Sequence, residues 1–277
     1  MKTSNKLLIS LAVLLIVIPI IVVAVNIKMN YVASTSGSFV DTQVANSEPF
    51  EKKTANRASI PIKTKFSTIN INNGKRVFLE LHFIESEMYG VKVPEDIKDD
   101  IKFNVDNSGV LQIDFDDKLD GSHTGDTIVI VVYSPNIHAL NLNNLSSVVL
   151  TARADTLSIN MKRSGSLSLG TPITFSVNEK ITRVINQTDI KQLNVNLDSA
   201  SFYSSNSSYK NLNINCKDSS VDIKGDQKNS IDNLTINTFN TSEITLENVM
   251  INNISGDFSD KTKVQMPVKY LKQMFKK

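Results

Sequence analysis

The chain has 277 residues, 40% of them hydrophobic, which is enough to bury a sizeable core in one extended domain or two compact ones. Thirty lysine and arginine residues nearly balance 28 aspartate and glutamate residues, and a formal net charge of +2 excludes the strongly basic surface of a typical nucleic-acid-binding protein. The single cysteine, Cys216, excludes an intrachain disulfide, and we interpret it as a small core residue.

The first 30 residues are interpreted as an N-terminal transmembrane anchor. Residues 7–25 carry no charge and, as a helix, are long enough to cross the hydrocarbon core of a bilayer. The run is longer than the apolar region of most signal peptides and has no good cleavage site after it. Lys2 and Lys6 precede it, which favours a single-pass protein with a cytoplasmic N-terminus and the remaining chain outside the membrane, in the periplasm or at the cell surface.

A linker and a series of strands follow the anchor. Residues 31–59 are rich in Ser, Thr, Asn and charge and have no sustained period, so we expect a tether. From Ile60 onward, apolar alternation and one unbroken apolar run predict strands, the last of them buried on both faces. These strands are KFSTINI (65–71), RVFLELHF (76–83), GVKV (90–93), IKFNV (101–105), VLQIDF (110–115) and TIVIVVY (127–133).

Two short motifs recur from Leu140 onward. A Leu-x-apolar motif starts at residues 140, 157, 193, 212 and 234, and a second apolar series follows at Val148, Leu167, Phe202, Val221 and Ile244. Two strands per period of about 20 residues, with Asn, Ser or Asp at the corners, predict a parallel β-solenoid. The long step from 157 to 193 would contain a drifted intermediate rung near Ile181. An antiparallel β-sandwich is the alternative, because its strands also recur at short intervals.

The tail 266–277 is predicted to be either a short capping helix or a free basic tail. Pro267 suits the first turn of a helix. One face of that helix would be apolar and would cover the last rung near Ile251 and Ile254. The residues of that face are Val268, Leu271, Met274 and Phe275. The predicted fold is therefore an all-β, β-helix-like domain over residues 60–265, followed by this tail as either a cap or a free extension.

A family resemblance covers about residues 60–250. Apolar strand motifs run in order from Phe66 to Ile113, the junction YSPNI follows at residues 133–137, and the SxVxL repeats come after it. This order resembles the head GIN domain, a bacterial family described as an auto-transporter adhesin domain. The resemblance implies a β-solenoid-like stack behind an N-terminal export or membrane signal. The stretch from Thr171 to Ile190 departs from the family pattern.

One acidic cluster, DFDDKLDG, has some similarity to a calcium loop. Lys118 stands where a third ligand would come, so we interpret the segment as a solvated hairpin loop, with a weak calcium site as the alternative. The carboxylates of the cluster are those of Asp114, Asp116, Asp117 and Asp120. A second acidic set lies near repeat corners, where its members would cap turns or stack in a row. This set is Asp198, Asp218 and Asp222.

No signature of catalysis is found in the sequence. His82, His123 and His138 do not have the spacing of shared metal ligands. The sequence also lacks a nucleophile elbow, a phosphate-binding glycine loop and a defensible acid/base pair. We therefore predict no catalytic, cofactor-binding or metal site, and a protein that is not an enzyme.

Three functions remain compatible with the sequence. The first is a non-catalytic binding or adhesion module of the cell envelope, monomeric and anchored to the membrane, with an envelope glycan or protein as ligand. The second is a structural scaffold that assembles end to end through its exposed rungs. The third is a carbohydrate-active β-helix enzyme, which the missing catalytic constellation disfavours.

Overall fold

The structure is a computed structural model, and it describes residues 15, 17–19, 48–169, 173–177, 180–185, 188–226 and 228–275. The chain divides into two compact units, Met1–Ala45 and Asn46–Lys277. Apart from residues 15 and 17–19, the predicted membrane segment 7–25 lies outside the described residues. Among the residues that are described, no helix combines the length and apolar character needed to cross a bilayer.

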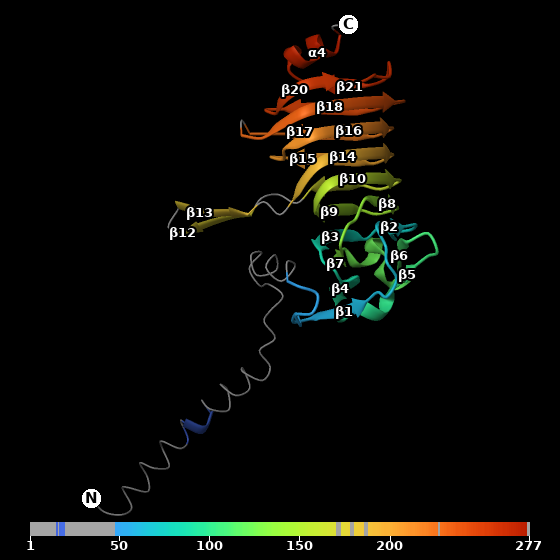
Figure 1. Cartoon of the computed structure of the whole chain (residues 1–277), viewed down its shortest axis with the longest axis vertical. Coiled ribbons are helices and arrows are strands. Elements are labelled where there is room, and N and C mark those ends of the chain that lie inside the picture. The colour runs from blue at the N-terminus through green and yellow to red at the C-terminus, as the bar shows by residue number, and fades with distance from the viewer. Residues whose placement is uncertain are drawn as a thin grey trace, which may run out of the picture. The chain divides into compact units, whose positions relative to one another are not determined.

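The second unit is mostly β-structure and contains two large sheets, which Figure 1 shows as a stack of layers. The ten-stranded sheet has the order β1 (Arg57–Pro61), β4 (Gly90–Pro94), β7 (Thr127–Ser134), β3 (Phe78–Glu85), β9 (Ser147–Thr151), β11 (Ser166–Leu169), β15 (Ser201–Ser205), β17 (Ser220–Lys224), β19 (Glu243–Glu247) and β21 (Lys263–Gln265). The nine-stranded sheet has the order β20 (Met250–Ser255), β18 (Ser230–Phe239), β16 (Tyr209–Lys217), β14 (Asp189–Asp198), β10 (Arg153–Lys162), β8 (Ala139–Asn143), β2 (Thr68–Ile71), β6 (Val110–Phe115) and β5 (Ile101–Val105). Short helices η1 (Lys98–Asp100), η2 (Asp117–Leu119) and α3 (Gly121–Thr124) connect strands near one end.

All six strands predicted between residues 65 and 133 are present, as β2 to β7. From β8 onward the chain alternates between the two sheets, and the pairing within each sheet is parallel. The second apolar series stands in line across the ten-stranded sheet, as predicted: Val148, Leu167, Phe202, Val221 and Ile244. The antiparallel sandwich is therefore wrong for the repeats. Antiparallel pairing joins β1 to β4, β4 to β7 and β5 to β6 at the other end of the unit.

Two details predicted for the first series are wrong. Leu140 pairs with Ile159 rather than with Leu157. This shift of two residues leaves the same side chains facing inward, so the apolar pattern could not distinguish the two registers. In addition, no intermediate rung separates β10 from β14, because Leu157 pairs directly with Leu193. The residues in between contribute β12 (Ile173–Val177) and β13 (Lys180–Ile185), which pair antiparallel with each other as a separate two-stranded sheet.

The corners of the layers explain part of the Asn, Asp and Ser content. At the ends of β8, β10, β14, β16 and β18, the chain leaves the nine-stranded sheet through a residue with positive φ. Asn and Asp adopt this conformation more readily than most residues. These corner residues are Asn144, Arg163, Ser199, Asp218 and Asn240, with φ between 45° and 59°. Just after one of these corners, a Cβ atom added to Gly165 would lie 1.9 Å from the carbonyl oxygen of Ser146. Glycine there lets two successive layers come close together.

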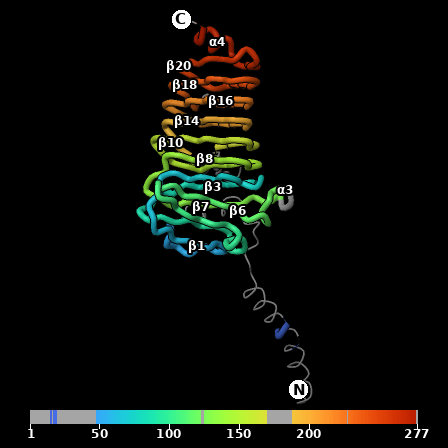
Figure 2. The backbone as a smooth tube through the Cα atoms, turned by 90° about the vertical axis from the view of Figure 1, so that its right-hand side faces the viewer, coloured from blue at the N-terminus to red at the C-terminus, as the bar shows by residue number. Residues whose placement is uncertain are grey.

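The hydrophobic core runs between the two sheets through the successive layers, and Figure 2 shows the backbone of these layers after a turn of 90°. Inward-facing side chains such as Leu140, Val148 and Phe202 are fully buried, and each contributes about 1.5–3 kcal/mol by leaving water. Cys216 lies in this core, as predicted. Burial raises the pKa of its thiol to about 11, so the thiol is protonated and unreactive at neutral pH.

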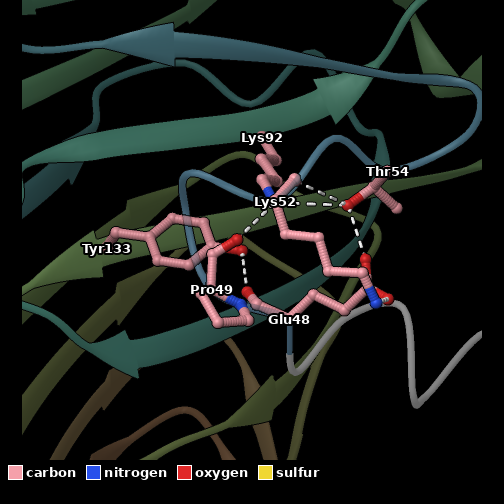
Figure 3. Close-up of polar contacts among 6 residues, drawn as sticks. All are labelled: Glu48, Pro49, Lys52, Thr54, Lys92 and Tyr133. Carbon is pink, nitrogen blue, oxygen red and sulfur yellow. Dashed lines mark hydrogen bonds and ion pairs between the residues drawn. The ribbon is translucent and has the colours of Figure 1, made fainter.

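Residues 48–56, assigned to the linker from the sequence, pack against the folded unit. The ammonium of Lys92 is fully buried and donates to the carbonyl oxygens of Pro49 and Lys52, both at 2.8 Å, and to Thr54 Oγ1 at 3.2 Å (Figure 3). Burial lowers the pKa of Lys92. These acceptors are mostly backbone atoms, which leave no signature in a sequence pattern. The linker boundary predicted at residue 59 is therefore too late.

The same segment covers the outer face of β7. The Phe50 ring meets the Tyr133 ring edge-on, with 5.2 Å between centroids, and the Tyr133 hydroxyl donates to the carbonyl oxygen of Glu48 at 2.6 Å. Burial raises the pKa of Tyr133 to about 12. Val131 and Tyr133 are thereby buried on the face opposite Ile130 and Val132. This explains the unbroken apolar run of β7, whose burial on both faces is confirmed.

The predicted capping helix is present as α4 (Val268–Met274) and packs against β20, the last strand of the nine-stranded sheet. Its anchor is Tyr270, of which 2% is exposed. The Tyr270 hydroxyl donates to the carbonyl oxygen of Val249 at 2.6 Å and accepts from the backbone N–H of Ile251 at 3.0 Å. Through the Tyr270 hydroxyl, the helix thus forms hydrogen bonds with one backbone group just before β20 and one near the start of β20.

The apolar face predicted for this helix is only partly correct. Leu271 and Met274 are half-buried, but Val268 is 63% exposed and Phe275 is 77% exposed. Tyr270 takes the central position instead, because its ring covers apolar surface while its hydroxyl satisfies backbone groups that an aliphatic side chain could not.

Candidate functional site

The outer face of the nine-stranded sheet carries a continuous line of amide side chains. Alternation along each strand sends leucine-type residues into the core and the residues between them outward, as in Leu140-Asn141-Leu142. One outward position is asparagine on six successive strands, from β2 to β18. We call these residues the asparagine column: Asn70, Asn141, Asn160, Asn196, Asn215 and Asn237.

Side-chain hydrogen bonds connect most of the column. The Nδ2 of Asn160 donates to Oδ1 of Asn141 at 2.8 Å, and Asn196 donates to Asn160 at 2.7 Å. Asn215 in turn donates to Asn196 at 2.8 Å, and Asn237 donates to Asn215 at 2.9 Å. A primary amide has two N–H donors and two acceptor lone pairs. At the three central residues the ladder uses one of each, so one N–H and one lone pair per layer remain available to a ligand.

An open groove of about 550 Å³ lies along this column. Its other side is formed by residues two positions further along the strands, which also stand in register. We call them the groove edge: Asn143, Lys162, Asp198, Lys217 and Phe239. Lys217 and Asp198 approach to 3.6 Å, and Lys162 leaves the edge with one positive charge in excess. Phe239 is 55% exposed and is the large aromatic side chain of the groove lining.

The predicted acidic cluster is spread over several local contacts. Asp116 accepts from the backbone N–H of Lys118 at 3.1 Å, Asp117 pairs with Lys75, and Asp120 accepts from the N–H of Ser122 at 2.9 Å. In the part of the chain that the structure describes, no three His, Cys, Asp or Glu side chains are grouped as metal ligands. These three contacts stabilise the loop, and the separate partners of Asp116, Asp117 and Asp120 do not favour the calcium alternative.

The second acidic set does not form a row. Asp198 stands between Lys162 and Lys217 in the register of the nine-stranded sheet. Asp218 occupies a corner and accepts from Asn240 Nδ2 at 3.0 Å and from the N–H of Thr241 at 3.3 Å, bonds that lower its pKa. Asp222 lies on β17 and contacts Lys224 at 3.3 Å. The predicted turn capping therefore describes Asp218, whereas Asp198 and Asp222 neither cap a turn nor stack and instead pair with lysines.

The three histidines are in unrelated places. His82 is buried on β3 with Nε2 2.7 Å from Glu80 Oε1, and His138 is exposed just before β8. The side chain of His123 lies outside the described residues.

The asparagine column was not predicted, although a signal for it was present. Asn141, Asn160, Asn196 and Asn215 recur in steps of 19, 36 and 19 residues, within one residue of the steps of the second apolar series. We assigned asparagine to the corners, where Asn144 and Asn240 do lie, because a single sequence does not show that residues in successive layers face the same side.

Comparisons with solved structures show several similar chains. A crystal structure of a putative adhesin from Parabacteroides distasonis is 14% identical, with 73% of this chain and 77% of that chain covered and a TM-score of 0.46. A putative adhesin from Bacteroides fragilis is 13% identical over 76% of this chain and 96% of that chain, with a TM-score of 0.38. A putative lipid binding protein from Parabacteroides distasonis is 14% identical over 76% and 94%, with a TM-score of 0.33.

No curated protein sequence matches the chain. The family model described as "Putative auto-transporter adhesin, head GIN domain" matches residues 65–247, about two thirds of the sequence. The match includes the strands from β2 to β19 and all residues that line the groove, and it confirms the resemblance drawn from strand order. The chain belongs to the head GIN domain family.

Proposed function

We propose that the protein is a membrane-anchored, extracytoplasmic β-solenoid that acts as a non-catalytic binding module of the cell envelope. Its binding surface is the groove between the asparagine column and the groove edge. The observation that carries the proposal is the row of amide groups that keep one donor and one acceptor available in successive layers. A rigid, regularly spaced polar surface of this kind suits recognition of an extended ligand.

The solenoid interpretation is supported by the path of the chain. Between β8 and β21 the chain places one strand in each sheet before it enters the next layer, apart from the β12–β13 insertion. The scaffold alternative needs a free surface at both ends of the stack. Because α4 packs on β20, end-to-end assembly is disfavoured at that end.

The proposed location rests on residues 7–25, whose uncharged length fits a bilayer, and on the lysines before them. Protease added to intact spheroplasts is expected to digest the folded unit and to leave a short N-terminal fragment in the membrane. A folded unit that is protected until the spheroplasts are lysed would contradict the orientation. A mature N-terminus beyond residue 25 would contradict the anchor.

Binding is tested with purified full-length protein and isolated cell-envelope fractions in a sedimentation assay. Asn196→Ala removes an amide from the groove, and we expect it to weaken binding about tenfold. Asn194→Ala is the matched control, because Asn194 lies on the same strand and makes a similar ladder bond with Asn213 at 2.9 Å but does not line the groove. Equal binding by the two variants and the unchanged protein would contradict the proposed surface.

A further inference from the structure

The groove also indicates what kind of ligand it binds. We infer that the ligand is a linear, uncharged polysaccharide that lies along the stack, with its hydroxyl or acetamido groups bonded to the asparagine column and one sugar ring packed on Phe239. This inference deepens the proposed function and rests on it. It is carried by the hydrogen-bonding capacity of the amides, the length of the groove, its charge and its exposed aromatic ring.

The amide groups match sugar hydroxyls in chemistry. At Asn160, Asn196 and Asn215, one N–H and one lone pair are left by the ladder, and a hydroxyl both donates and accepts. A carboxylate or phosphate group would use only the donors, and an ammonium group only the acceptors. A polymer with hydroxyls at regular intervals can use both groups in each layer.

The groove has the length of several sugar units. Neighbouring strands are about 4.8 Å apart, so a groove lined from β2 to β18 extends over about 24 Å. Its floor is a regular sheet, and the ladder bonds hold the amides in fixed orientations before a ligand arrives. Several weak contacts can therefore add along an extended chain without a large ordering cost.

Phe239 supplies the apolar contact that hydroxyl-rich ligands need. The ring is 55% exposed and follows Lys217 in the register of the groove edge. A flat aromatic face packs well against the C–H face of a sugar ring, and burying it removes apolar area from water. The lining therefore offers one stacking platform beside a row of amides.

Charge and composition argue against other ligand classes. The groove edge has Lys162 and Lys217 against Asp198, an excess of a single positive charge along the whole groove, so a polyanion would have only one of its charges balanced there. A protein partner would require an apolar or aromatic centre to the interface, and this groove exposes a single large apolar side chain among amides and charges.

The test is calorimetric titration of the full-length protein in a detergent that has no sugar headgroup. Cellohexaose and chitohexaose are the neutral probes, and hexagalacturonate is the charged comparison. We expect a neutral hexasaccharide to bind and its monosaccharide to give no measurable heat at the same concentration, because one sugar contacts only one layer. Phe239→Ala is expected to weaken binding about tenfold. Tyr203→Ala is the control, since Tyr203 is 42% exposed on the ten-stranded sheet, outside the groove.

Tighter binding of hexagalacturonate than of either neutral hexasaccharide would overturn the inference, as would equal affinity of Phe239→Ala and the unchanged protein. If neither cellohexaose nor chitohexaose binds, the sedimentation assay is repeated with envelope fractions whose glycans have been oxidised by periodate. If groove-dependent binding to those fractions persists and is lost after protease treatment, the partner is a protein, and the proposed function stands while the ligand class falls. If untreated envelope does not bind either, both proposals fail.

Discussion

A chain that begins at residue 58 is expected to be less stable than one that begins at residue 46 by roughly 4.5–9 kcal/mol, or not to fold. The shorter chain lacks the carbonyl oxygens of Pro49 and Lys52, which accept hydrogen bonds from the buried ammonium of Lys92. Hydrogen bonds to charged groups each contribute about 1.5–3 kcal/mol. The shorter chain also loses Phe50, whose burial contributes about 1.5–3 kcal/mol. The measurement is urea denaturation of both chains.

Three further variants separate this cause from a general effect of shortening. Glu51→Ala and Lys53→Ala change exposed positions of the same segment and should leave the free energy of unfolding unchanged. Lys92→Met in the shorter chain should recover part of the loss, because an apolar side chain needs no acceptors. Indistinguishable unfolding of the two chains would show that residues 46–57 contribute nothing to the fold.

Removal of the C-terminal helix is expected to turn a monomer into oligomers or aggregates. In a chain that ends at residue 266, Tyr270 no longer pairs with the carbonyl of Val249 and the N–H of Ile251, and β20 becomes an open edge. Exposed strand edges with apolar neighbours such as Ile254 are sites of intermolecular pairing. Light scattering coupled to size exclusion measures the change in mass.

Point substitutions give a graded form of the same experiment. Tyr270→Phe removes only the hydroxyl and should cost about 1–3 kcal/mol, because it leaves buried backbone groups unpaired. Val268→Ser changes an exposed residue of the same helix and is the control. A monomeric chain ending at residue 266 with an unchanged melting temperature would contradict the role of α4 as a cap. Filaments formed by the intact protein would instead favour the structural scaffold.

The sequence by itself determined the six strands between residues 65 and 133 and the alignment of the second apolar series in one sheet. Alternation of apolar residues is a local property, and it is visible in RVFLELHF as β3 and in the aligned series from Val148 to Ile244. The positive-φ corners were also accessible, because Asn and Asp tolerate that conformation for reasons contained in their own side chains. Strand order was sufficient to indicate the family.

Only the tertiary structure decided the features that depend on pairing between distant residues. The two-residue shift between Leu140 and Leu157 is invisible to alternation, because both registers bury the same face. Two of the three acceptors of Lys92 are backbone carbonyls 43 and 40 residues earlier in the chain, and every residue type carries such a carbonyl. The asparagine column exists because parallel layers bring Asn141, Asn160 and Asn196 side by side, and only that alignment converts scattered amides into one binding surface.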